Sequence, residues 1–189
     1  MKQSKTSKLA YFAGILDGEG TIGIYKKNDS NSEYNSRGRG LSLYKLSISI
    51  GQKRGPIIDW LAGNFGGRIF TKQQVTTVPG SKKFYDHEMY EWRLDNIEEL
   101  IYLLKRIIPF LTEKKDQAEL ALQFAQRHQH VKNTGTQCGF VTKIPDDVLE
   151  EWKKFAEEKS KQLKKLKRKH VPSAAVETKF SKPSNDGKL

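Results

Sequence analysis

The stretch Phe12-Ala13-Gly14-Ile15-Leu16-Asp17-Gly18-Glu19-Gly20 decides the fold. Its apolar residues, together with Leu9, follow the i, i+3, i+4, i+7 spacing of an amphipathic helix, with Ser7 as N-cap and Gly18 and Gly20 as its end. Residues 21–27 then alternate apolar and other side chains, which predicts a strand with one buried face. We therefore expect a helix joined to a strand through an acidic, glycine-rich turn.

The chain up to residue 130 repeats an order of helix, strand and strand. Strands are predicted over residues 44–50, 68–74 and 88–94, and helices over 56–65, 97–107 and 113–130. Pro56 and the Gly66-Gly67 pair bound one helix, and Pro109 separates the last two. The order αββαββα predicts an α+β fold with one four-stranded antiparallel sheet backed by helices.

The remainder of the chain divides by composition. Residues 1–132 are expected to form the core, and 133–170 a Gly/Thr-rich connector followed by a basic helix over Asp146–Lys169. Residues 171–189 carry Pro, Ser and Asn with little to bury, which predicts disorder.

The net charge of +12 and the sequence pI near 9.6 point to a polyanionic partner. The alternative is that the lysines over residues 164–169 only keep the C-terminal part in solution. The single Cys138 excludes an intramolecular disulfide, and the Cys and His residues have no zinc-binding spacing, so any metal is expected to have oxygen ligands. No apolar run suits a bilayer or a signal peptide, which predicts an intracellular, unsecreted protein of the cytoplasm or of a DNA-containing organelle.

Residues 12–20 resemble the LAGLIDADG motif of homing endonucleases. Two further segments strengthen the resemblance: Gly51-Gln52-Lys53, which resembles the family's glutamine-bearing turn, and 109–118, which resembles its helix-opening lysine segment. The resemblance covers about residues 8–130, and such ordered co-occurrence is more specific than one motif. It implies a site-specific, Mg²⁺- or Mn²⁺-dependent endonuclease that breaks both strands of a long, pseudo-palindromic DNA target as a homodimer, in the manner of intron homing.

The motif has a physical rationale of its own. Small Ala13 and Gly14 would let a second copy of the helix approach closely, while Phe12 and Leu16 fill space around the contact, so these four residues are the expected dimer interface. Glu19 would then meet its copy near the two-fold axis, where a divalent cation removes the repulsion, with the Gly18 carbonyl as a further ligand. Asp17 is expected to bind backbone amides of the turn.

The resemblance also implies the other catalytic residues. Gln52 would position the attacking water, and Lys114 would stabilise charge at the phosphate or help to position that water. Two positions depart from the family pattern. Glu19 stands where the motif has Asp, and Pro56 stands near the place of an arginine, so Arg54 is the nearest substitute.

The face of the sheet opposite the helices is the expected DNA surface, because a mixture of basic and polar side chains can contact both base edges and phosphates. The alternative is an ordinary solvated sheet face. The residues expected to bind DNA are Thr21, Tyr25, Lys27, Arg37, Arg39, Lys45, Ser47, Ser49, Arg68, Lys72, Gln74 and Arg93.

The sequence leaves two hypotheses about the function. The first is an endonuclease, which the presence of Glu19, Gln52 and Lys114 favours. Because the chain has a single copy of the motif, this enzyme would have to act as a homodimer. The second is an intron RNA-splicing maturase, with intron RNA as partner, or a DNA-binding regulator that does not cleave.

Overall fold

The computed structural model describes residues 4–26, 43–53, 55–77, 84–134, 136–137, 140–141 and 144–169. The tail expected to be disordered, 171–189, lies outside them. The elements in chain order are α1 (Lys5–Glu19), β1 (Gly20–Lys26), β2 (Tyr44–Lys53), α2 (Pro56–Phe65), β3 (Arg68–Thr77), β4 (Phe84–Leu94), α3 (Ile97–Ile107), η3 (Ile108–Phe110), α4 (Lys115–Thr134), β5 (Thr136–Gln137), β6 (Phe140–Val141) and α5 (Asp146–Lys169). The predicted αββαββα order is confirmed.

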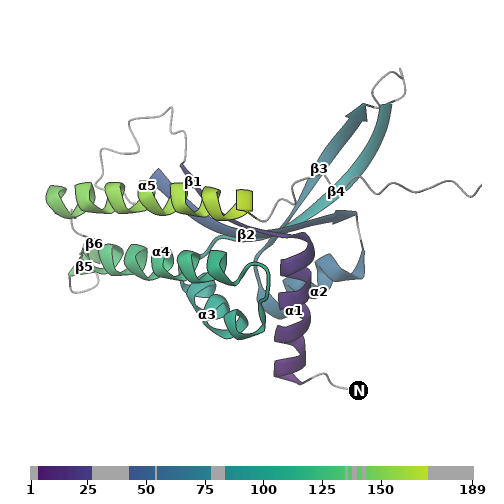
Figure 1. Cartoon of the computed structure of the whole chain (residues 1–189), viewed down its shortest axis with the longest axis horizontal. Helices are drawn as coiled ribbons and strands as arrows, with labels where there is room; N and C mark the ends of the chain where they lie inside the picture. The colour runs from purple at the N-terminus through teal and green to yellow at the C-terminus, as the bar shows by residue number, and fades with distance from the viewer. Residues whose placement is uncertain are drawn as a thin grey trace, which may run out of the picture.

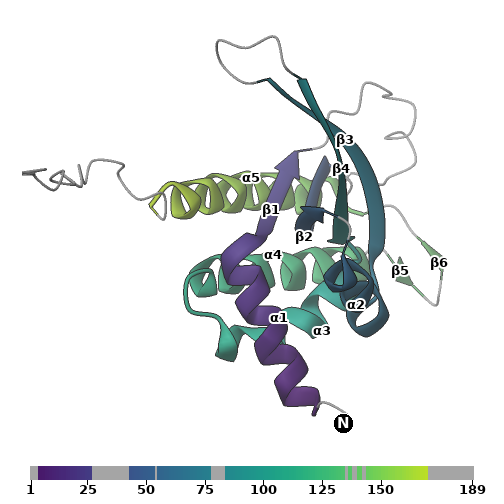
Figure 2. The same cartoon turned by 90° about the vertical axis from the view of Figure 1, so that its right-hand side faces the viewer.

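The four long strands form one antiparallel sheet in the order β1-β2-β4-β3. As the alternation predicted, one face of this sheet is buried against the helices. Its core-facing residues include Ile22, Ile24, Leu46, Ile48, Ile50, Trp92 and Leu94. Figures 1 and 2 show α3 and α4 together on that side, while the β3–β4 hairpin projects away from the helices. The opposite face is therefore left uncovered by α3 and α4.

The first helix is longer than the sequence pattern indicated. It begins at Lys5, because the Ser4 hydroxyl accepts a hydrogen bond from the Ser7 amide at 3.1 Å and caps the helix. Ser7 therefore lies inside the helix, and its prediction as the cap was wrong. At the other end the helix continues through Gly18, so that Glu19 is its last residue and Gly20 its C-cap.

The turn between α2 and β3 depends on two glycines. Gly66 and Gly67 have φ values of 69° and 81°, a left-handed region that other residues rarely adopt. A Cβ on Gly67 would also lie 2.7 Å from the Arg93 carbonyl oxygen. The predicted end of the helix at this pair is confirmed.

The last helix, α5, belongs to the hydrophobic core. Trp152, Ala156 and Leu163 are buried, and the Trp152 ring lies 5.0 Å from that of Phe124 on α4. The Ser160 hydroxyl donates to the Ile24 carbonyl of β1 at 3.1 Å, so α5 also contacts the edge strand of the sheet. The hydrophobic core of the described residues therefore includes one face of α5. None of the described helices has the length and apolar character needed to cross a membrane.

Candidate active site

Glu19 and Gln52 meet where the first helix enters the sheet. Glu19 is exposed at the end of α1, and Gln52 donates a hydrogen bond from Nε2 to its carboxylate across 33 positions of sequence. Gln52 does not lie in a turn, as the resemblance implied, because β2 continues to Lys53 and pairs Gln52 with Tyr90 of β4. The sheet thus fixes the backbone from which this amide reaches the acid.

Asp17 links the end of α1 to the segment that begins α4. Its carboxylate accepts the backbone N–H of Thr112 at 2.8 Å and that of Lys114 at 2.9 Å. These amides precede α4 and would otherwise lack intrahelical partners. Asp17 therefore binds backbone amides, as predicted, but they belong to a distant segment and not to its own turn.

Replacing Asp17 by alanine is expected to destabilise the fold by about 3 kcal/mol, because two hydrogen bonds to a charged acceptor are lost. In a chain of this size the melting temperature should fall by roughly 6–12 °C. Thermal unfolding followed by circular dichroism measures the change. Glu19→Ala is the matched control, because Glu19 has no such backbone role and its loss should change the melting temperature by less than about 2 °C. Equal melting temperatures for the two variants would contradict the structural role of Asp17.

Lys114 caps the C-terminal end of α1. Its Nζ donates to the carbonyl oxygen of Leu16 at 2.8 Å and also to that of Asp17, where a helix end favours positive charge. Burial lowers the pKa of Lys114, and the nearby carboxylates of Asp17 and Glu113 oppose that shift. The lysine is thus held beside the end of α1, one turn from Glu19.

A polar cleft opens beside Lys114 and contains a residue that sequence reasoning missed. It lies between the end of α1, the start of α4 and the C-terminal part of α5. Its lining residues are Asp17, Gly18, Gly20, Thr21, Glu113, Lys114, Gln117 and Lys167. Lys167 belongs to a run of lysines, a pattern that predicts exposure to solvent. Its spacing of four residues from buried Leu163 was the available signal that it lies on the packed face.

The uncovered sheet face carries the predicted DNA-binding side chains that the structure describes, although one of them, Ser47, is buried. Strand pairing sets Thr21 beside Ser49, and Ser49 beside Arg93. A groove on this face is lined by Thr21, Tyr25, Lys26, Lys45, Ser47, Ser49, Glu91, Arg93 and Asp95. Because Thr21 lines both this groove and the cleft beside Lys114, the two hollows are adjacent at the start of β1.

The two arginines of this face are held by acids and by an aromatic ring. Arg93 pairs with Glu91, and Arg68 with Asp95 at 2.5 Å. The guanidinium carbons of Arg93 and Arg68 also lie 4.9 and 5.5 Å from the centre of the Phe70 ring, a cation–π arrangement. Phe70 was not predicted as a site residue, although the alternation from Arg68 places it on this face. The acids partly offset the positive charge that the sequence indicated there.

Several expected site residues cannot be placed. Arg54, Lys27, Arg37 and Arg39 lie outside the described residues, and so do the side chains of Lys72 and Gln74.

The sequence matches no family model and no curated protein, whereas the structure resembles solved homing endonucleases. The archaeal intron-encoded homing endonuclease I-Vdi141I, complexed with DNA, is 20% identical with a TM-score of 0.56, over 86% of this chain and 94% of that one. The homing endonuclease I-CvuI, in complex with its target in the presence of 2 mM Ca, is 18% identical with a TM-score of 0.50, over 87% and 94%. This chain has the LAGLIDADG homing endonuclease fold.

Within the LAGLIDADG fold, the motif helix α1 buries the side that we had assigned to a partner. Phe12, Ala13 and Leu16 are fully buried in the core of their own subunit, and Phe12 packs 5.7 Å from the Trp92 ring. Their assignment to a dimer interface was therefore wrong, because a side chain enclosed by its own subunit cannot contact another. Gly14 is exposed. The exposed residues around it on the same side of the helix are Ser7, Ala10, Tyr11 and Gly18.

The LAGLIDADG turn offers oxygen donors that suit a hard divalent cation. Glu19 is exposed and, among the described residues, its carboxylate accepts a hydrogen bond from the neutral amide of Gln52, while the adjacent Gly18 lines the cleft. Among the described residues no three His, Cys, Asp or Glu side chains form a metal-binding cluster. Mg²⁺ is often bound through one or two carboxylates, with water and substrate phosphate completing its shell. The described residues therefore fit a cation bound through the Glu19 carboxylate, with water and substrate phosphate completing its shell.

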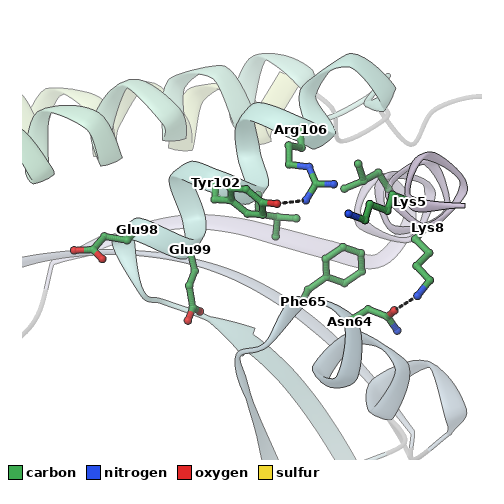
Figure 3. A pocket seen from close by; sticks show the side chains of 10 residues that line it. Lys5, Lys8, Asn64, Phe65, Glu98, Glu99, Tyr102 and Arg106 are labelled. Atoms are coloured by element: carbon green, nitrogen blue, oxygen red, sulfur yellow. Dashed lines mark hydrogen bonds between the residues drawn. The ribbon is translucent and has the colours of Figure 1, made fainter.

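A further hollow lies at the other end of α1, between α2 and α3 (Figure 3). Lys8 Nζ donates to Asn64 Oδ1 at 2.6 Å there, and Arg106 donates to the Tyr102 hydroxyl at 2.7 Å. Along the axis of α1 this hollow is roughly 20 Å from Glu19. Two of its cations, Lys8 and Arg106, are thus engaged with neutral groups, and the hollow is separate from the Glu19 site.

Proposed function

We propose that this chain is a LAGLIDADG homing endonuclease that binds double-stranded DNA and breaks both strands with the help of Mg²⁺ or Mn²⁺. The observation that carries the proposal is the junction at Thr21. There the sheet groove lies beside the cleft of Lys114, and the end of α1, where Glu19 and Gln52 are paired, is next to it along the chain. A DNA backbone that follows the groove would therefore pass the acid, the amide and the lysine.

The sheet face is suited to the DNA major groove. Hydroxyls of Thr21 and Ser49 can donate to or accept from base edges, while Lys45 can contact phosphates. Arg93, held by Glu91 and stacked near Phe70, presents a preorganised guanidinium for a base edge. The DNA complex of I-Vdi141I, which has this fold, supports the same role here.

The chemistry proposed for the site is hydrolysis of a phosphodiester. Glu19 and the Gly18 carbonyl would hold the cation, which supplies charge neutralisation at the phosphate and makes a bound water more acidic. Gln52, already bonded to Glu19, would orient the attacking water. Lys114, beside the cleft, would stabilise the negative charge that grows on the phosphate oxygens.

Cutting both strands requires two such sites, and we propose that a homodimer provides them. The exposed small residues around Gly14 allow α1 to approach the same helix of a second copy closely. This contact would bring Glu19 near the partner subunit's Glu19, where both could bind cations close to the cleaved phosphates. A two-fold axis at this place also implies a target with two related half-sites.

Selection of bound duplexes from a degenerate DNA library, with Ca²⁺ as the divalent ion, tests the binding half of the proposal. We expect a long target of pseudo-palindromic sequence. Its affinity should fall steeply with salt, by about 0.9 log units per log unit of salt for each phosphate contacted. Lys45→Gln, on the groove, should reduce that slope by about 1, whereas Lys105→Gln, exposed on α3, should leave it unchanged. Equal slopes for the two variants would remove the sheet face as the DNA surface.

A further inference from the structure

Lys167 enters the cleft from the last helix of the chain. It lies on the face of α5 that carries Trp152, Ala156 and Leu163, at spacings of 15, 11 and 4 residues, and these three are buried against the body. The packing of α5 therefore sets the direction in which Lys167 points. Lys165, which is exposed, lies on the opposite side of the helix.

The cleft brings the Lys167 ammonium close to that of Lys114. Burial of its ammonium, and then the nearby Lys114 cation, lower the pKa of Lys167. Within the described part of the chain, Lys167 has no hydrogen-bond or ion-pair partner, whereas Lys114 donates to two carbonyls. Two acids line the same cleft: both carboxylate oxygens of Asp17 are engaged with amides, and Glu113 is exposed at its rim. Two neighbouring cations in a half-buried cleft favour an anion between them.

Gln117 gives a second indication that the cleft takes a polar ligand. Its side chain is only 3% exposed, and its Oε1 is buried without a hydrogen-bond partner among the described residues. An unpaired buried acceptor is costly, so such a group ordinarily receives a donor from a ligand or an ordered water. The cleft thus combines two ammonium groups with an acceptor that a water molecule can satisfy.

We propose that Lys167 is a further active-site residue, and that its ammonium, together with that of Lys114, binds the DNA phosphate at which the chain cuts. Gln117 would accept a hydrogen bond from a water between this phosphate and the floor of the cleft. The inference rests on the proposed nuclease function and deepens it. It gives α5 a part in the reaction in addition to its part in the core.

Single-turnover cleavage of the selected duplex in Mg²⁺, at saturating protein, tests this assignment. Lys167→Met keeps the aliphatic stem that packs in the cleft and removes the charge, so the cleavage rate should fall by about a hundredfold. Affinity measured with Ca²⁺ should change by less than about tenfold, since one of many phosphate contacts is lost. Lys165→Met removes an equal charge from the exposed side of α5 and should cut like the unaltered chain. Lys167→Arg should recover part of the rate.

A binding measurement then locates the contact without reference to the rate. A neutral methylphosphonate replaces the phosphate that the unaltered chain cuts, and affinity is measured with Ca²⁺. The replacement should weaken binding of the unaltered chain by about threefold more than that of Lys167→Met, because the variant has already lost the ammonium. Equal losses, or a Lys167→Met rate equal to that of Lys165→Met, would overturn the assignment while the nuclease function stood. An unaltered chain that cuts no selected duplex would overturn both.

Discussion

Replacing Glu19 by glutamine is expected to abolish cleavage while fold and DNA affinity persist. Glutamine preserves the shape of the side chain but removes the charge that would hold a divalent cation. The side chain is exposed and its hydrogen bond is to Gln52, so little of the folded state depends on it. We expect the single-turnover rate in Mg²⁺ to fall at least about a thousandfold.

The matched control for this variant is Glu98→Gln. Glu98 is also exposed at a helix terminus, but it lies in the first turn of α3 beside the hollow at the other end of α1. This variant should cut at the rate of the unaltered chain. Cleavage by Glu19→Gln at that same rate would show that Glu19 does not hold the cation.

Replacing Gly14 by leucine is expected to separate folding from assembly. A Cβ on Gly14 would meet no atom within 4 Å in its own subunit, and leucine favours a helix more than glycine does, by about 1 kcal/mol. The subunit should therefore fold at least as stably as before. Between two copies of α1, however, a leucine would push the backbones apart. Sedimentation should then show a monomer, and double-strand cleavage should fall at least about a hundredfold.

Gly63→Leu is the control for this effect. Gly63 is also an exposed helical glycine with open space around its Cβ position, but it lies on α2. Its replacement should leave both the dimer and cleavage unchanged. A Gly14→Leu chain that sediments as a dimer and cuts normally would place the subunit interface elsewhere.

Local pattern was enough to predict most of the elements. The bounds of α2, α3 and α5 agree with the prediction because proline, glycine and asparagine mark helix ends by local chemistry. The sheet faces followed from the alternation of Ile22, Ile24 and their neighbours, since a strand turns successive side chains to opposite sides.

The predictions that were wrong or missing concern residues whose surroundings are set by tertiary contacts. Phe12, Ala13 and Leu16 form the apolar stripe of α1. The pattern alone does not indicate whether the same chain or a second copy covers such a stripe. In the structure it is covered by the core of its own subunit. The sequence places Gln52 in a turn, because its pairing with β4 is not visible in the local pattern. The sequence predicts that Lys167 is one of many exposed lysines. Its place in the cleft depends on the packing of α5 along α4.

The central claim is metal-dependent cutting of both strands, and a cleavage assay on the selected duplex tests it most directly. The unaltered chain is mixed with the end-labelled duplex in Mg²⁺ or in EDTA, and both strands are resolved on a denaturing gel. We expect one cut in each strand in Mg²⁺, at positions related by the two-fold symmetry of the target, and none in EDTA. A duplex that is bound tightly but stays intact in Mg²⁺ and in Mn²⁺ would contradict the nuclease function and leave a DNA-binding protein.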